Sequence, residues 1–324
     1  MNNVETIDRS TGRGSSAGPM IRARDIGNFP KEHVWNGFVK GAGIFMIILP
    51  IAIGIFLFIK GCGTFTTYGH SITEFLFSAD WNPADDSAGG GTVGAAVYIV
   101  GSLYTCGLAL LIAVPFSLAA AIFMTEIAPV LGNRFLKPAV EIFVGIPSVV
   151  YGWIGLTILI PFLKAVFHLN QGFSVLAAGI VLAVMIFPSI TTLSADAIRG
   201  VSMDCRKGAY GMGATRWQVI YQIVLPAAKP GVLTGIILGL ARAFGEALAV
   251  AMVIGKTRAF PKSILSATSN LTSAIASDMG GAMEGGEYNT ALWTMALLLF
   301  LISLLFIFIV HQIGKHGEAE NAAK

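Results

Sequence analysis

Six long apolar runs constrain this chain more than any other feature of its sequence. A helix needs about 20 mostly apolar residues to cross a bilayer. The runs cover residues 41–59, 95–123, 142–163, 172–194, 231–255 and 289–313. Together they contain only two Asp, Glu, Lys or Arg side chains, although these types make up 12% of the 324 residues. We therefore predict an all-α polytopic membrane protein with six transmembrane helices, and not a soluble enzyme.

The charges between the runs predict how the chain is oriented. Lys and Arg accumulate in short cytoplasmic loops. The segment 196–229 carries five basic and two acidic residues, whereas the first loop after residue 59 is acidic. We expect both termini in the cytoplasm, with residues 1–38 as a disordered tail, 39–314 as the membrane domain and 315–324 as a second tail.

Arg242 and Glu246 are the two ionisable residues inside the runs. Arg242 stands 13 residues after Lys229 and 14 before Lys256, so in a continuous helix it lies roughly 20 Å from either end. A charge at that depth costs at least ~2.5 kcal/mol. We predict that Arg242 binds an anion on a substrate pathway, since a guanidinium forks onto an oxyanion, with Glu246 one helical turn away as its neutralising partner. The alternative is a structural ion pair inside the bundle.

The same run has a small residue at every fourth position. These residues are Gly231, Gly235, Gly239, Ala243, Ala247 and Ala251. Small side chains let a neighbouring membrane helix approach closely. We therefore expect the stripe to pack against another span.

Residues 207–226 predict a cytoplasmic helical hairpin. Gly213 permits a turn between two short helices, and Pro226 is expected to halt the second of them. The coupling loop of ABC-transporter permeases has a characteristic pattern: an alanine, three residues, a glycine, nine residues and then Ile-x-Leu-Pro. The matching positions are Ala209, Gly213, Ile223, Leu225 and Pro226.

From about residue 81 to 313 the chain resembles the phosphate ABC transporter permease subunit of the PstC type, a membrane component of binding-protein-dependent importers. Its GIPSVVYG at residues 145–152 is similar to a signature shared with the PstA-type partner, and its ARAFGEA at 241–247 is closer to the PstC type. The resemblance implies a type I ABC importer permease-like fold in the bacterial plasma (inner) membrane. It also implies import of inorganic phosphate by alternating access.

The resemblance further implies a set of partners. They are a second permease subunit of the PstA type, a dimer of the cytoplasmic ATP-binding subunit of the PstB type docked on the loop at about 199–229, and an extracytoplasmic phosphate-binding protein of the PstS type. One departure concerns the loop itself. The family usually begins it with Glu-Ala-Ala, whereas residues 207–209 are Lys-Gly-Ala, so an acidic contact with the ATPase is absent or reversed.

No catalytic, cofactor or metal site follows from the sequence. Gly255-Lys256-Thr257 imitates the end of a phosphate-binding P-loop, but the glycine required five positions earlier is Val250. The five histidines show no paired metal-ligand spacing. Two alternatives stay open: a permease for another oxyanion such as sulfate or molybdate, and an ion-coupled secondary carrier in which Glu246 relays protons.

Overall fold

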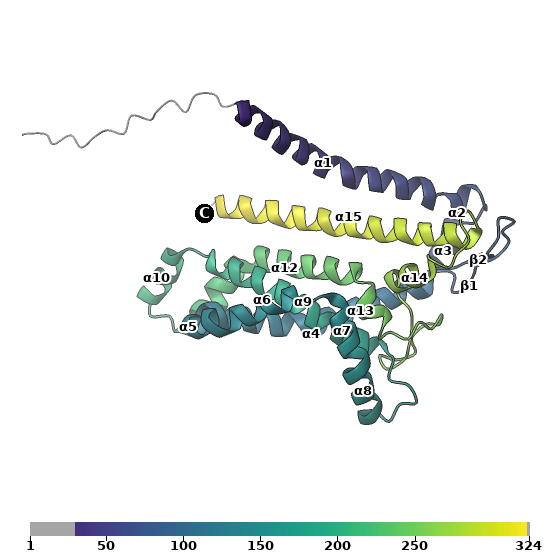
Figure 1. The fold of residues 1–324 in the computed structure, drawn as a ribbon. Coiled ribbons are helices and arrows are strands. Elements are labelled where there is room, and N and C mark those ends of the chain that lie inside the picture. Colours follow the sequence, from purple (N-terminus) through teal and green to yellow (C-terminus); the bar gives the residue numbers. More distant parts are fainter. Residues whose placement is uncertain (1–29, 323–324) are drawn as a thin grey trace, which may run out of the picture. The chain divides into compact units, whose positions relative to one another are not determined.

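The computed structural model describes residues 30–322 (Figure 1). The chain forms two compact units, Met1–Ala52 and Ile53–Lys324. Every described residue of the first unit belongs to one helix, α1 (Pro30–Gly61). Residues 1–29 of the predicted N-terminal tail, and the last two residues of the predicted C-terminal tail, lie outside the described residues.

In the described part of the chain, six helices are long and apolar enough to cross a membrane, which confirms the predicted all-α architecture. They are Asn36–Thr66, Ala96–Ile127, Ser148–Val166, Val175–Arg199, Arg216–Gly245 and Glu287–Ile313. The last of these belongs to α15 (Glu287–Ala322), which continues beyond residue 314, the predicted end of the membrane domain.

The third apolar run is interrupted. It forms α6 (Lys137–Gly145), an extended residue at Ile146, α7 (Ser148–Ile154), a π-helical turn η3 (Gly155–Leu159) and α8 (Ile160–Val166). Pro147 explains the interruption, because proline has no N–H to donate and disfavours helical geometry in the residue before it. The span therefore consists of short helical pieces that meet at an irregular backbone segment.

The fifth run begins earlier than expected. α11 (Arg216–Val219) continues through a π-helical turn, η4 (Ile220–Val224), into α12 (Leu225–Gly245). The prediction that the second hairpin helix ends near Pro226 is therefore wrong. Pro226 lies in the first turn of α12. Leu225 N–H there donates to the Ile220 carbonyl five residues back, and this wider turn accommodates a proline without ending the helix.

The same run also ends earlier than expected. α12 stops at Gly245, Glu246 has extended backbone angles (φ −78°, ψ 115°), and a four-residue helix, α13 (Leu248–Ala251), follows. The prediction of one continuous helix across residues 231–255 is therefore wrong. The physical cause lies in contacts with other parts of the chain, described below.

The centre of the second unit is α9 (Val175–Arg199). Buried residues make up 67% of its apolar window, a larger share than in any other span of the described chain. Two helices pack against it: α12 and α4 (Ala96–Ile122), which continues into the π-helical turn η1 (Phe123–Ile127) (Figure 1). This arrangement places Arg242, in the last turn of α12, beside the most buried helix.

The remaining short elements lie at the two ends of the second unit (Figure 1). What we call the hairpin end carries α5 (Pro129–Leu131), η2 (Gly132–Leu136) and α10 (Met203–Gly211). The opposite, loop end carries α2 (Gly63–Thr66), α3 (Ile72–Phe77), α14 (Leu271–Asp278) and the antiparallel pair β1 (Trp81–Asn82) and β2 (Thr92–Val93).

Candidate functional site

Glu246 occupies the break between α12 and α13 and is held there from two sides. Its carboxylate Oε1 accepts a hydrogen bond from the N–H of Ala249 at 3.1 Å, so the side chain caps the start of α13. Its backbone carbonyl accepts a hydrogen bond from Thr272 Oγ1 of α14 at 2.9 Å. These contacts provide partners for backbone groups that leave the helical hydrogen-bond pattern.

Arg242 lies in the last turn of α12, and its Nη1 donates to Ser189 Oγ of α9 at 2.9 Å. Much of its side chain is otherwise exposed. Among the described residues no ion pair joins Arg242 to Glu246, so the two side chains do not form the direct pair expected within one helical turn. The extended backbone at Glu246 directs its carboxylate to the amide of α13 and not back along α12. Arg242 therefore presents a guanidinium with hydrogen-bond donors to spare.

The last residue of the 145–152 signature packs against α13, directly after the break at Glu246. A Cβ added to Gly152 of α7 would lie 2.8 Å from the Cα of Ala249 in α13, which is closer than real side chains come to a backbone atom. Only glycine allows α7 and α13 to pack this tightly. Because irregular backbone at membrane depth is tolerated only inside protein or beside a water-filled cavity, the breaks at Ile146 and Glu246 identify this region as the candidate functional site.

The small-residue stripe of α12 packs against α9, as predicted. Added Cβ atoms at Gly231 and Gly239 would lie 2.6 Å and 2.7 Å from side-chain atoms of Ala197 and Ile190, respectively. Close packing without intervening side chains is the expected use of such a stripe in membrane helices. The position of Arg242 relative to α9 is therefore fixed by helix packing.

The predicted hairpin forms, and its turn explains the spacing of Ala209 and Gly213. Gly213 has φ +83°, in the left-handed region that favours glycine. Its N–H donates to the Tyr210 carbonyl at 3.0 Å, and the next N–H, of Ala214, donates to the Ala209 carbonyl at 3.1 Å. This is the Schellman pattern that ends a helix. Thr215 then begins α11 with a capping box.

The other predicted coupling residues lie around the base of the hairpin. Ala209 is buried in a cluster with Val219 and Val224, and Ile223 and Leu225 pack against that cluster. Pro226 is exposed in the first turn of α12. The structure therefore joins three of these five residues, Ala209, Ile223 and Leu225, through one small core, and leaves Gly213 and Pro226 exposed outside it.

An ion pair that the sequence did not reveal attaches the hairpin to the second span. Arg206 of α10 pairs with the carboxylate of Glu126 at the end of η1, and it also donates to the Ile198 carbonyl at 2.6 Å. Arg216 of α11 donates to the backbone carbonyls of Glu126 and Ile127. Both helices of the hairpin are therefore bound to one point on η1. The signal available was a lone acidic residue at the end of an apolar run.

The outer surface of the hairpin exposes large apolar side chains. They belong to Met203, Tyr210, Met212, Trp217 and Tyr221, and Met212 is 85% exposed. Lys207, which replaces the acidic residue of the resembling family, is exposed beside them. A clustered apolar surface with a charged rim is typical of a protein interaction site.

A buried carboxylate at the loop end was also missed. Glu287 is fully buried, and its oxygens accept hydrogen bonds from the N–H groups of Ala84, Gly90 and Gly91 at 2.7, 3.1 and 2.9 Å. His70 Nε2 lies 2.7 Å from the same carboxylate. Burial opposes protonation of His70, but hydrogen bonds to Glu287 and Glu74 outweigh it and raise the pKa of the imidazole. This cluster fastens the loop after β1 to the start of α15.

The imitation of a P-loop takes no part in a nucleotide site. Gly255 has φ +97° and forms an isolated β-bridge with Thr268, so the triplet follows no strand and begins no helix. In the described part of the chain, no group of three His, Cys, Asp or Glu residues is placed to hold a metal ion.

Comparisons with known proteins agree on the kind of chain this is. Residues 113–316 match the family model of binding-protein-dependent transport system inner membrane components. The probable ABC transporter permease protein YqgH of Bacillus subtilis is 46% identical over 280 residues, which cover 86% of this chain and 90% of that protein. The phosphate transport system permease protein PstC of Pasteurella multocida is 37% identical over 302 residues, covering 87% and 91%.

A solved structure supports the fold independently. The crystal structure of a bacterial alginate ABC transporter, in complex with an alginate-bound periplasmic protein, contains a chain that superposes with a TM-score of 0.52. The match covers 87% of this chain and 97% of that one at 16% sequence identity. At that identity the similarity concerns the fold alone.

Proposed function

The chain belongs to the family of binding-protein-dependent transport system inner membrane components, and we propose that its cargo is inorganic phosphate. It is the permease component of an ABC importer and spans the inner membrane several times. The proposal of phosphate draws on the PstC-type motifs in the sequence and on the PstC proteins among its relatives. We further propose that the chain catalyses no reaction of its own and that a separate ATPase supplies the energy.

The partners we propose are the remaining parts of such an importer. A PstA-type permease pairs with this chain, a PstB-type ATPase dimer docks on the hairpin, and a PstS-type protein delivers phosphate at the loop end. The exposed apolar side chains of the hairpin support docking there. The basic segment 196–229 supports a cytoplasmic hairpin end and cytoplasmic termini.

We propose that the hairpin transmits motion of the ATPase to the spans through Ala209, Gly213, Ile223, Leu225 and Pro226. Two contacts support this role. At the turn around Gly213, hydrogen bonds cap both the end of α10 and the start of α11. The pairing of Arg206 with Glu126 joins the hairpin to η1, which continues α4. Movement of α10 and α11 therefore displaces the end of a span directly.

The observation that carries the proposed pathway is the guanidinium of Arg242 beside an interrupted helix. Arg242 makes one hydrogen bond, to Ser189, and is otherwise exposed in the described chain. An Arg side chain within an apolar span is costly unless it serves a pathway or a partner. We propose that it binds the anion in transit. Glu246 then keeps the empty pathway close to neutral and limits how tightly phosphate is held.

Uptake of labelled phosphate tests the proposed cargo. Cells that contain the chain with its importer partners are expected to accumulate labelled phosphate, and cells that lack only this chain are not. Labelled sulfate and molybdate serve as matched anions. Accumulation of either of these in place of phosphate would assign the permease to another oxyanion.

A further inference from the structure

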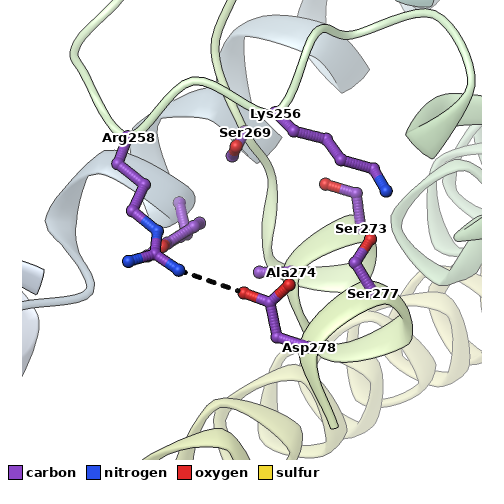
Figure 2. Close-up of a pocket in the computed structure, with 8 residues that line it drawn as sticks. Lys256, Arg258, Ser269, Ser273, Ala274, Ser277 and Asp278 are labelled. Carbon is purple, nitrogen blue, oxygen red and sulfur yellow. Dashed lines mark ion pairs between the residues drawn. The ribbon is translucent and has the colours of Figure 1, made fainter. Parts of the chain in front are cut away.

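A small cavity at the loop end lies apart from Arg242. It has a volume of about 70 Å³ and is lined by Tyr98, Lys256, Arg258, Ser269, Ser273, Ala274, Ser277 and Asp278. This is well above the roughly 10–15 Å³ of such volume that holds one water molecule, so the cavity has room for a group larger than a single water. Figure 2 shows Arg258 and Lys256 on opposite sides, with the serines and Asp278 between them.

A buried hydroxyl without a partner lines this cavity. Tyr98 of α4 is 1% exposed, and its OH has no hydrogen-bond partner in the described structure. A buried hydroxyl left unpaired has lost its hydrogen bonds to water without replacing them, which is unfavourable. A ligand that accepts a hydrogen bond from this OH removes that cost.

Other donors around the cavity are also available. The ammonium of Lys256 and the hydroxyls of Ser269 and Ser277 make no hydrogen bond or ion pair with any described residue. Ser273 differs, because its hydroxyl already belongs to the cap of α14. The available groups therefore comprise one cation and three hydroxyls.

The second cation is partly engaged. Arg258 Nη2 lies 3.5 Å from Asp278 Oδ2 and 3.3 Å from the hydroxyl of Tyr288. That hydroxyl also donates to Asp278 Oδ2 at 2.5 Å. Asp278 Oδ1 and the remaining guanidinium nitrogens of Arg258 have no partner within the described residues. The lining thus carries two positive charges, one negative charge and one free carboxylate oxygen.

We infer that this cavity binds hydrogen phosphate at the loop end, an inference that rests on the proposed import of phosphate. Lys256, Arg258 and the hydroxyls of Tyr98, Ser269 and Ser277 donate to the unprotonated oxygens. Charge-assisted donors of this kind are the strongest ligands for oxyanions in proteins. Phosphate near neutral pH retains at least one P–OH group, which donates to Asp278 Oδ1.

Asp278 gives the cavity a means of selection. Sulfate carries no proton near neutral pH, so its oxygens meet the Asp278 carboxylate without a hydrogen bond between them. An unpaired acceptor facing an anion disfavours binding, and such a mismatch is an effective basis for specificity. The cavity is therefore expected to prefer phosphate to sulfate.

The location of the cavity connects it with the proposed pathway. Ser273 lines the cavity, and its neighbour Thr272 donates to the carbonyl of Glu246. α14 thus contacts the cavity with one side and the helix break with another. The cavity and the break beside Arg242 are therefore linked through adjacent residues of one helix.

Equilibrium binding of inorganic phosphate to the purified full chain in lipid nanodiscs tests this inference. The measurements use the Arg242→Ala variant as background, so that the remaining binding reports the cavity and not the pathway. In this background Lys256→Gln is expected to weaken phosphate binding about 10-fold or more, and Tyr98→Phe about 3-fold, from the usual strengths of charged and neutral hydrogen bonds. Lys262→Gln, an exposed lysine of the same loop that does not line the cavity, is the matched control and leaves affinity unchanged.

Sulfate provides the second arm of the experiment. Asp278→Asn replaces an acceptor with a group that can donate, so the preference for phosphate over sulfate is expected to shrink. Absence of phosphate binding in the Arg242→Ala background overturns the inference, as does binding that neither Lys256→Gln nor Tyr98→Phe weakens. If the cavity binds phosphate while cells import none, the proposed function is refuted and the phosphate site in the cavity is supported. If cells import phosphate while the cavity binds none, only the cavity is refuted.

Discussion

Two helix breaks lie within 34 residues of each other, and they are built differently. At the Gly213 break the backbone groups find their hydrogen-bond partners within the same short segment. The carbonyls of Ala209 and Tyr210 accept hydrogen bonds from the N–H groups of the turn. The break at Glu246 depends on distant contacts, from Thr272 of α14 and from the close packing of Gly152 on Ala249. The first break is encoded in a short segment, whereas the second requires the folded bundle.

This difference fits the roles proposed for the two breaks. A turn whose hydrogen bonds are all local can keep its shape when the hairpin moves. This property suits the proposed role of the hairpin in transmitting motion from a docked ATPase. A break maintained by contacts between helices changes when those helices move relative to one another. Such a break is suited to a site whose access alternates between two sides of a membrane.

Among changes at the two breaks, the largest effect is expected at Glu246. Glu246→Gln retains an oxygen that can accept the N–H of Ala249 and removes the charge, whereas Glu246→Ala removes both. If the charge serves the pathway, we expect Glu246→Gln to lower phosphate uptake about 10-fold and Glu246→Ala to lower it further, in line with charged hydrogen bonds worth ~1.5–3 kcal/mol. Full uptake by Glu246→Gln, measured with labelled phosphate at equal protein levels, would reduce Glu246 to a helix cap.

The packing of Gly152 on Ala249 allows a stability test of the distant contacts. Gly152→Ala places a Cβ 2.8 Å from the Cα of Ala249, and we expect overpacking to destabilise the chain by ~1–3 kcal/mol. Gly145→Ala is the control, since its added Cβ meets no atom within 4 Å. Thermal unfolding of the purified chain in detergent measures both variants. Equal melting temperatures would mean that the break does not depend on this contact.

The local break is tested at Gly213. A β-branched residue in left-handed geometry is strained by about 1–2 kcal/mol, so Gly213→Val is expected to distort the turn. Space is not the cause, because an added Cβ there meets nothing within 4 Å. In proteoliposomes with the complete importer, the number of phosphate ions imported per ATP hydrolysed should fall several-fold. Gly211 is the last residue of α10, has no left-handed backbone, and has room for a side chain, so Gly211→Val should leave this ratio near that of the wild type.

The smallest effect concerns a distant contact at the loop end, between His70 and Glu287. Because the pKa of His70 is raised in the folded chain, its protonated form contributes stability below the ordinary value of about 6.5. That contribution is lost as pH rises through the raised pKa. We expect the melting temperature to fall from pH 6 to pH 8 more steeply in the wild type than in His70→Gln. Identical slopes would show that this contact does not titrate.

The membrane architecture was predictable from sequence because apolar length is a local property. Six apolar runs correspond to six candidate spans in the described part of the chain. The hairpin was predictable for a related reason, since the Ala209 to Gly213 spacing is the spacing of a Schellman turn. Both features depend on residues that are close together in the chain.

The remaining features depend on residues that are far apart in the chain. Arg206 meets Glu126 across 80 residues, and Glu287 meets the loop at Ala84 across 203. The break after Gly245 was missed because a small residue at every fourth position is compatible with one continuous helix. The contacts with Thr272 and Gly152 that maintain the break come from distant parts of the chain. The roles of Arg242, Glu246 and the five coupling positions stay predictions that transport measurements must decide.

ATP-driven phosphate uptake by Arg242 variants of the complete importer in proteoliposomes tests the account most directly. Removal of a charged donor that contacts the anion predicts a loss of uptake of about 10- to 100-fold in Arg242→Ala. Arg242→Lys should retain part of the uptake, and Ser189→Ala, which removes only the neighbouring hydroxyl, should retain nearly all of it. Undiminished uptake by Arg242→Ala, or uptake by vesicles that lack the ATPase, would contradict the account.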